Sequence, residues 1–277
     1  MRRSLLLLAR IFRGLANRFQ ELGTERYYTD DLPARDVLLA GMLESMRRGT
    51  PWHEVIRNPR ASVHGERIAE YTYVYGEIAR RPVGALLDVG CVLNNPTFDR
   101  FLPRECDVSF LNPASEPIVR QRATYYRRPL AEYAGPGFPL VTCLSTLEHI
   151  GFDNTRYGTN LTDEGWDWPR AEACIVENVE RLCGLVTPGG TLVVSFPYGR
   201  REFVRLPPGR GPRVWQVLHP GHVGKLRASP LLKDAELVFV RLGASGWEIV
   251  DEDAEFAAYG RVSCGASGLL ILRWHRT

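Results

Sequence analysis

Apolar residues recur along the chain with two different spacings. Residues 64–80, HGERIAEYTYVYGEIAR, carry apolar side chains at intervals of three and four from Ile68 to Ile78, which predicts a helix with one buried face. Residues 172–185 are predicted to form a second helix, closed by a Pro-Gly-Gly turn. Short apolar runs instead predict buried strands. They lie at residues 85–90, 107–111, 123–126, 140–144, 191–196, 247–250 and 269–274, while residues 237–242 fit a strand or a helix.

Strands that alternate with helices predict an α/β fold. We expect a Rossmann-like, seven-stranded, mostly parallel sheet with helices on both faces. No helical pattern separates the last two strands, so an antiparallel C-terminal hairpin is predicted there. Residues 1–60 are expected to be a helical N-terminal extension, and residues 61–277 the main domain. Ligands bind such sheets at the carboxyl ends of the strands, where strand order reverses. The residues that follow the first, second and fourth strands are therefore the candidates for a site.

Composition narrows the class of protein. Of the 277 residues, 44% are hydrophobic and 24% charged, as in ordinary globular proteins. The net charge of +3 is small, which argues against a dedicated nucleic-acid binder. No pair of the six cysteines has CxxC spacing, so neither a zinc site nor a redox pair is predicted. Buried free thiols in a reducing compartment are the simpler interpretation, and a cytoplasmic location is expected.

The N-terminal stretch, MRRSLLLLARIFRGLANRF, has a basic start and a short apolar run. Arg10 and Arg13 interrupt the run, and no small-residue cleavage site follows it. The run is too short for a membrane span. Its helical periodicity leaves two alternatives open: a helix packed on the domain or on a subunit partner, or association of residues 1–20 with a membrane surface. No later segment is predicted to span a bilayer, and the oligomeric state is not predicted.

Four segments occur in a fixed order along the chain. They are LLDVG at residues 86–90, VTCLSTLEHIG at 141–151, LVTPGGTLVVSFP at 185–197, and GWEIVDED followed by GLLILRW at 246–274. In this order and spacing they resemble the class I S-adenosylmethionine-dependent methyltransferases, over roughly residues 64–277. The resemblance implies an enzyme with S-adenosylmethionine as cofactor. Three positions depart from the family pattern. Only Gly90 remains of the usual glycine-rich loop, Asn112 replaces an acid after the second strand, and Pro139 replaces an acid before the fourth.

The resemblance also implies cofactor-binding residues. Asp88, Gly90 and Cys91 fall in the first loop, where a backbone turn with free N–H groups would suffice for the methionine carboxylate. Asn112 can still bond a ribose hydroxyl without carrying a charge. The remaining cofactor candidates are Ser145, after the fourth strand, and Arg67, whose guanidinium suits a carboxylate. A plain strand-to-turn junction and a solvated arginine on an amphipathic helix are the structural alternatives.

Glu148 and His149 are the catalytic candidates that the resemblance implies. A histidine there is a candidate general base, because its ordinary pKa of about 6.5 lies near the working pH. Glu148 would orient His149. The alternative is that both residues cap the following segment and fix the turn.

Substrate-binding candidates lie in two further stretches. One is GFDNTRYG, with Asp153, Asn154 and Tyr157; its alternatives are a turn held by Asx hydrogen bonds and a metal site that includes Asp153. The other is residues 199–236, which the resemblance marks as a substrate-side insertion, with Trp215 and His219 as candidates. The HPGH pair is too short and isolated for a convincing metal site, so no metal is predicted.

The predicted activity is O-methylation of a small hydroxylated acceptor, such as a sugar or a natural-product intermediate, with His149 as the general base. N- or C-methylation of a small molecule is the alternative within the fold. A non-catalytic, methyltransferase-like binding protein is the alternative from another class, because most of the usual loop glycines are missing.

Overall fold

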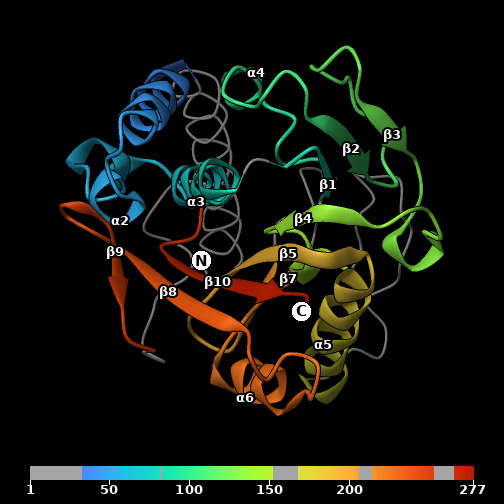
Figure 1. Ribbon diagram of the computed structural model, residues 1–277. Coiled ribbons are helices and arrows are strands. Elements are labelled where there is room, and N and C mark those ends of the chain that lie inside the picture. Colours follow the sequence, from blue (N-terminus) through green and yellow to red (C-terminus); the bar gives the residue numbers. More distant parts are fainter. Residues whose placement is uncertain (1–32, 82, 152–167, 206–213, 253–264) are drawn as a thin grey trace, which may run out of the picture.

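The computed structural model describes residues 33–81, 83–151, 168–205, 214–252 and 265–277 (Figure 1). Its centre is an eight-stranded sheet with the order β3-β2-β1-β4-β5-β10-β8-β9. Strands β1 to β5 run parallel, and β10, β8 and β9 pair antiparallel beyond them. Their bounds are β1 Ala85–Val89, β2 Asp107–Leu111, β3 Thr124–Tyr126, β4 Phe138–Leu144, β5 Val186–Pro197, β8 Glu236–Gly243, β9 Gly246–Val250 and β10 Gly268–His275. The predicted α/β class is confirmed.

Two details of the sheet differ from the prediction. The sheet has eight strands rather than seven, because the ambiguous run near residues 237–242 forms β8. The C-terminal strands are antiparallel as expected, but the hairpin joins β8 to β9 through a turn at Ala244 and Ser245, and Gly246, the first residue of β9, has a φ of 105°. Strand β10 instead lies between β5 and β8. Burial explains this order: Leu269 to Leu272 of β10 are all buried, as an inner strand requires, whereas Ile249 of β9 is 43% exposed.

Helices cover both faces of the sheet (Figure 1). Leu86 and Leu87 of β1 point to opposite faces because strand side chains alternate. Leu86 packs in a core with Tyr71 and other residues of α3, and Leu87 packs in a core with Ile175 and other residues of α5. The helical elements are α2 Trp52–Val55, η1 Pro59–Val63, α3 Arg67–Arg80, α4 Pro96–Asp99, η2 Leu130–Glu132, η3 Leu147–His149, α5 Trp168–Gly184 and α6 Pro220–Ala228, and residues 33–47 are also helical.

The predicted insertion at residues 199–236 contains a small hairpin and α6. Strand β6, Glu202–Arg205, pairs antiparallel with β7, Val214–Val217, outside the main sheet. Strand β7 packs against η3, directly after β4. The insertion therefore reaches the carboxyl end of the fourth strand.

Strand order fixes where a ligand would bind. From β1 the chain moves to β2 and β3 on one side, and it then returns to β4 and β5 on the other side. The order therefore reverses between β1 and β4, and a crevice is expected beyond their carboxyl ends. Residues 90–95 and 145–149 lie at this point.

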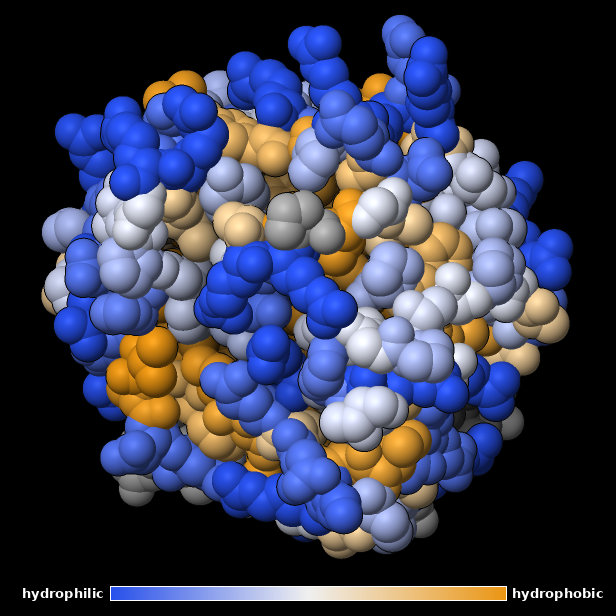
Figure 2. Space-filling view, in the orientation of Figure 1, coloured by the Kyte–Doolittle hydropathy of each residue, from blue (hydrophilic) through white to orange (hydrophobic). Residues whose placement is uncertain are grey.

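The surface drawn in Figure 2 is predominantly hydrophilic, with apolar groups in separate small patches. A cavity of about 390 Å³ lies between α6 and the start of β8, lined by Leu226, Leu232, Leu237 and their neighbours. Its lining residues are not those that follow β1 and β4, so the cavity does not mark the site that the topology predicts. Within the described residues, no helix is long and apolar enough to cross a membrane.

Candidate functional site

Gly90 brings the loop after β1 into close contact with the end of β4. Its φ is 98°, and a Cβ at this position would lie 2.1 Å from Oγ1 of Thr146. Its N–H donates to the carbonyl of Leu111 at 2.9 Å, so the same residue also joins the loop to β2. Only glycine meets both the backbone and the steric requirement without strain. The glycine kept from the family pattern thus has a local physical reason.

The carboxylate of Asp88 connects this loop to β4 through hydrogen bonds. The side chain is fully buried, its Oδ2 accepts from the N–H of Leu93 at 2.7 Å, and its Oδ1 accepts from the hydroxyl of Thr142 at 2.8 Å. Burial raises the pKa of Asp88 to about 7, although these hydrogen bonds favour the charged form. These contacts support a role for Asp88 in orienting the loop.

The raised pKa of Asp88 predicts a pH-dependent stability. Because folding favours the protonated carboxyl, its contribution is complete below the unfolded value of about 4 and is lost as pH rises towards about 7. The free energy of unfolding of wild type relative to Asp88→Asn should therefore fall across this window and level off above it. Urea titrations at several pH values would measure this difference. Asp107→Asn, at an exposed position, is the matched control, and identical pH profiles for both variants would refute the assignment.

The rest of the loop is tied down by its own polar groups. The hydroxyl of Tyr71 donates to the carbonyl of Val92 at 2.8 Å. Asn94 bonds the backbone of residues 117 and 119, and Asn95 accepts from two N–H groups at the start of α4. Cys91 has a φ of 60°, and burial raises the pKa of its thiol, which keeps it protonated. Among the described residues, no hydrogen bond uses the N–H groups of Cys91 and Val92. These two N–H groups are therefore the candidates in this loop for binding an anionic group.

An acidic side chain follows β2 after all. Asn112 is buried, and its Nδ2 donates to Oε1 of Glu116 at 2.8 Å. Glu116 is partly exposed, and burial raises its pKa. Glu116 was not predicted from the sequence, because the acid was expected directly after the strand, at the position of Asn112. The available signal was an acid four residues after Asn112, in the turn NPASEP.

Glu70 is the centre of a buried network between α3 and the sheet. Its Oε2 pairs with Nη1 of Arg67 at 2.5 Å, and its Oε1 accepts from the hydroxyls of Ser145 at 2.6 Å and Ser195 at 2.5 Å. Glu70 is fully buried, and the Arg67 side chain is 29% exposed. The predicted partner of Arg67 was the cofactor carboxylate. Here the guanidinium of Arg67 is paired with Glu70 instead, and the hydroxyl of Ser145 donates to the same Glu70 carboxylate.

Glu148 and His149 stand together in η3. His149 Nε2 lies 3.8 Å from Glu148 Oε1, and Glu148 is 1% exposed. Burial raises the pKa of Glu148 well above its usual range. Burial, with the nearby charge of Arg67, lowers the pKa of His149 to about 3. The ring of Trp215 lies 5.6 Å from that of His149, so β7 lies next to η3.

Three substrate-binding predictions are not addressed by this geometry. Asp153, Asn154 and Tyr157 lie outside the described residues. His219 lies within the described residues but belongs to a different cluster, with Glu172 and His222. That cluster contacts β7 through the hydrogen bond between His222 and Gln216.

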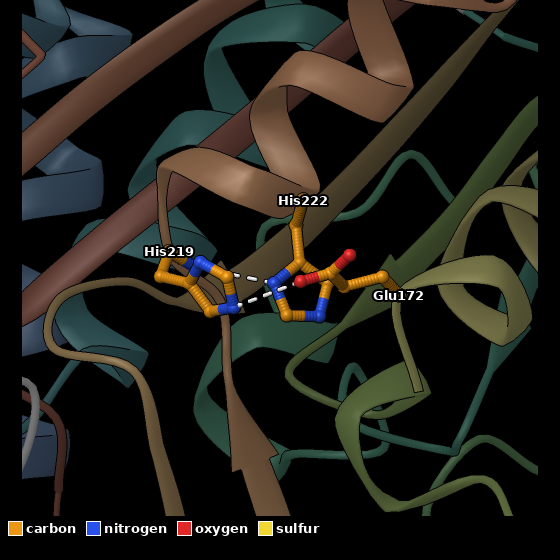
Figure 3. A group of neighbouring side chains, drawn as sticks. All are labelled: Glu172, His219 and His222. Carbon is orange, nitrogen blue, oxygen red and sulfur yellow. Dashed lines mark hydrogen bonds and ion pairs between the residues drawn. The ribbon is translucent and has the colours of Figure 1, made fainter. Parts of the chain in front are cut away.

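The second cluster consists of Glu172 from α5 and of His219 and His222 at the start of α6 (Figure 3). Their ligand-type atoms lie within 4.8 Å of one another, and all three residues are buried. His219 Nε2 is 3.3 Å from Glu172 Oε1, and Lys225 Nζ is 3.1 Å from Glu172 Oε2. Zn²⁺ and Fe²⁺ bind to sets of two imidazoles and a carboxylate, so this cluster is a candidate metal centre.

The hydrogen bonds of the two rings argue for a helix cap instead. His219 Nδ1 accepts from the N–H of Gly221 at 3.0 Å, and His222 Nδ1 accepts from the N–H of His219 at 3.3 Å. A neutral imidazole has only one acceptor nitrogen, so both lone pairs are already used by the helix start. Lys225 and the positive end of the helix further disfavour a cation. The cluster fits a reciprocal capping box braced by Glu172.

No protein-family model matches the sequence, and no curated protein matches it. Similar solved structures include the N-methyltransferase NodS from Bradyrhizobium japonicum WM9 with S-adenosyl-L-homocysteine, at 11% identity, a TM-score of 0.43, and coverage of 77% of this chain and 89% of that chain. A Burkholderia thailandensis 1,6-didemethyltoxoflavin-N1-methyltransferase has 15% identity, a TM-score of 0.45, and coverage of 77% and 80%. CalS10, an amino pentose methyltransferase from Micromonospora echinaspora, has 17% identity, a TM-score of 0.41, and coverage of 84% and 95%. These neighbours belong to the family that the sequence resembles. With TM-scores below 0.5, the activity of this chain has to be inferred from its own residues.

Proposed function

We propose that this chain is an S-adenosylmethionine-dependent methyltransferase that acts on a small molecule. The observation that carries the proposal is the set of groups at the reversal point of the sheet. Among the described residues, the N–H groups of Cys91 and Val92 make no hydrogen bond. The Asn112–Glu116 pair and Glu148 lie beyond the neighbouring strands. A site with anion donors, a hydroxyl-binding acid and a buried carboxylate suits an amino-acid nucleoside.

The residues present fit the cofactor in the following roles. The N–H groups of Cys91 and Val92 would bind its carboxylate, while Gly90 allows close approach of the backbone. Glu116, oriented by Asn112, would accept from the ribose hydroxyls. When bound, the cofactor supplies an electrophilic methyl group. The chain's own task is then to position the acceptor and to remove its proton.

Cofactor binding is the direct test. We expect S-adenosylhomocysteine to bind in isothermal titration calorimetry, and we expect Glu116→Ala to weaken that binding about tenfold or more, as the loss of a hydrogen bond to a charged group of about 1.5–3 kcal/mol implies. Glu105→Ala, at an exposed position before β2, is the matched control and should bind as wild type does. Absence of binding at millimolar ligand would exclude the proposed function.

The acceptor atom is the finer question. O-methylation with His149 as general base stays a prediction, and one physical property weighs against that role. A general base works best when its pKa is near the working pH, whereas burial lowers that of His149 to about 3. A neutral His149 remains suited to accept a hydrogen bond from the acceptor and so to orient it. N- or C-methylation and a non-catalytic binding role remain the alternatives, and measured turnover separates the last from the others.

A further inference from the structure

Glu148 is a buried acid whose carboxyl oxygens accept no hydrogen bond from another described residue. The residue is 1% exposed, and no other described residue donates a hydrogen bond to Oε1 or Oε2; its own backbone N–H is the one donor that favours the charged form. Buried polar groups are almost always hydrogen-bonded, and a buried charge is costly unless it is paired. A hydrogen-bond donor placed against the Glu148 carboxyl group would therefore stabilise it, and a positively charged donor would do so most.

The neighbouring groups do not meet this demand. Arg67, the nearest source of positive charge, pairs with Glu70 at 2.5 Å. Glu66 accepts from the N–H of Ala266 at 2.6 Å and adds another carboxylate to the same region. His149 Nε2 is 3.8 Å away, beyond hydrogen-bond reach, and its low pKa keeps the ring neutral. Three carboxyl groups thus share one guanidinium.

We propose that Glu148 binds the ammonium group of an amine acceptor and takes up one of its protons. The inference rests on the proposed function, because it places the acceptor at the residues that follow β4. In this step an N–H bond of the ammonium breaks and an O–H bond forms on a carboxylate oxygen of Glu148. The electron pair stays on nitrogen, which becomes a neutral nucleophile, and Glu148 becomes a neutral carboxylic acid. Charge is conserved, and no further reactant is needed.

Two properties support this role over a hydroxyl acceptor with His149 as base. Burial raises the pKa of Glu148 well above its usual range, so it accepts a proton more readily than an ordinary glutamate. An ammonium carries the positive charge that the carboxyl-rich surroundings lack, whereas a hydroxyl does not.

The test uses methylammonium chloride as the probe and the S-adenosylhomocysteine-saturated full chain. We expect methylammonium to raise the Tm of wild type in a saturable manner. Tetramethylammonium, which has the same charge but no N–H, should give a smaller shift. In Glu148→Gln the difference between the two salts should vanish, while Glu105→Gln keeps it.

The outcomes separate this inference from the proposed function. Equal shifts for the two salts in wild type, or an unchanged difference in Glu148→Gln, would overturn the amine assignment. A loss of S-adenosylhomocysteine affinity in Glu148→Gln would overturn it too, since Glu148 would then serve the cofactor. Failure of S-adenosylhomocysteine to bind wild type would instead remove the proposed function itself.

Discussion

Replacement of Glu70 by alanine should lower the free energy of unfolding by about 3–5 kcal/mol, the usual cost of breaking a buried ion pair from one side. The variant leaves the guanidinium of Arg67 without its partner and frees the hydroxyls of Ser145 and Ser195 from their acceptor. These residues tie α3 to the ends of β4 and β5. Urea unfolding followed by circular dichroism would measure the loss.

A surface ion pair provides the control for Glu70. Glu44 pairs with Arg47 at 2.7 Å within one helix, at the surface of the molecule. Glu44→Ala should leave the unfolding free energy nearly unchanged, because exposed pairs contribute little. Glu70→Gln keeps the shape and one acceptor, so it should fall between wild type and Glu70→Ala. If Glu70→Ala cost no more than Glu44→Ala, the network would have no structural importance.

Gly90→Ala should be the second severe change. It places a side chain at a φ of 98° and brings its Cβ within 2.1 Å of Thr146 Oγ1. Backbone strain and overpacking each cost about 1–3 kcal/mol, so thermal and urea unfolding should both show the loss. Relief of the clash requires the loop to move, and affinity for S-adenosylhomocysteine should fall with it.

Two further variants separate the causes in Gly90→Ala. Gly84→Ala, just before β1, adds a Cβ that meets nothing within 4 Å and should be close to neutral. The double variant Gly90→Ala/Thr146→Ala removes the two nearest atoms but keeps the positive φ. It should recover part of the stability, and that part measures the clash. Full stability of the single variant would show that the loop adapts freely.

The sequence predicted the main sheet well because its strands are buried. Runs such as residues 107–111 are apolar enough to be identified without tertiary information, and β2 has those bounds in the structure. Edge elements were harder: β6 and β7 are short strands outside the main sheet, and they were not predicted. Strand β10 pairs with both β5 and β8, and the spacing of apolar residues within a strand does not indicate which strands become its neighbours.

The candidate site was predicted in outline only. The segments after β1, β2 and β4 were identified because strand order directs attention there. Local pattern did not indicate the partner of each side chain. Glu70 meets Ser145 and Ser195, which are 75 and 125 residues away in sequence, so no spacing rule connects them. Likewise, the missing partner of Glu148 becomes apparent only when its surroundings are known.

Strand β7 gives the two sides of the insertion separate roles. Trp215 faces His149, whereas the next residue, Gln216, contacts Ala171 and His222 on the side of the helix cap. Adjacent side chains on a strand point in opposite directions, so one residue can change without disturbing the other. Under the proposed function, a substitution at position 215 would alter the acceptor side of β7, while position 216 would keep the anchorage of α6.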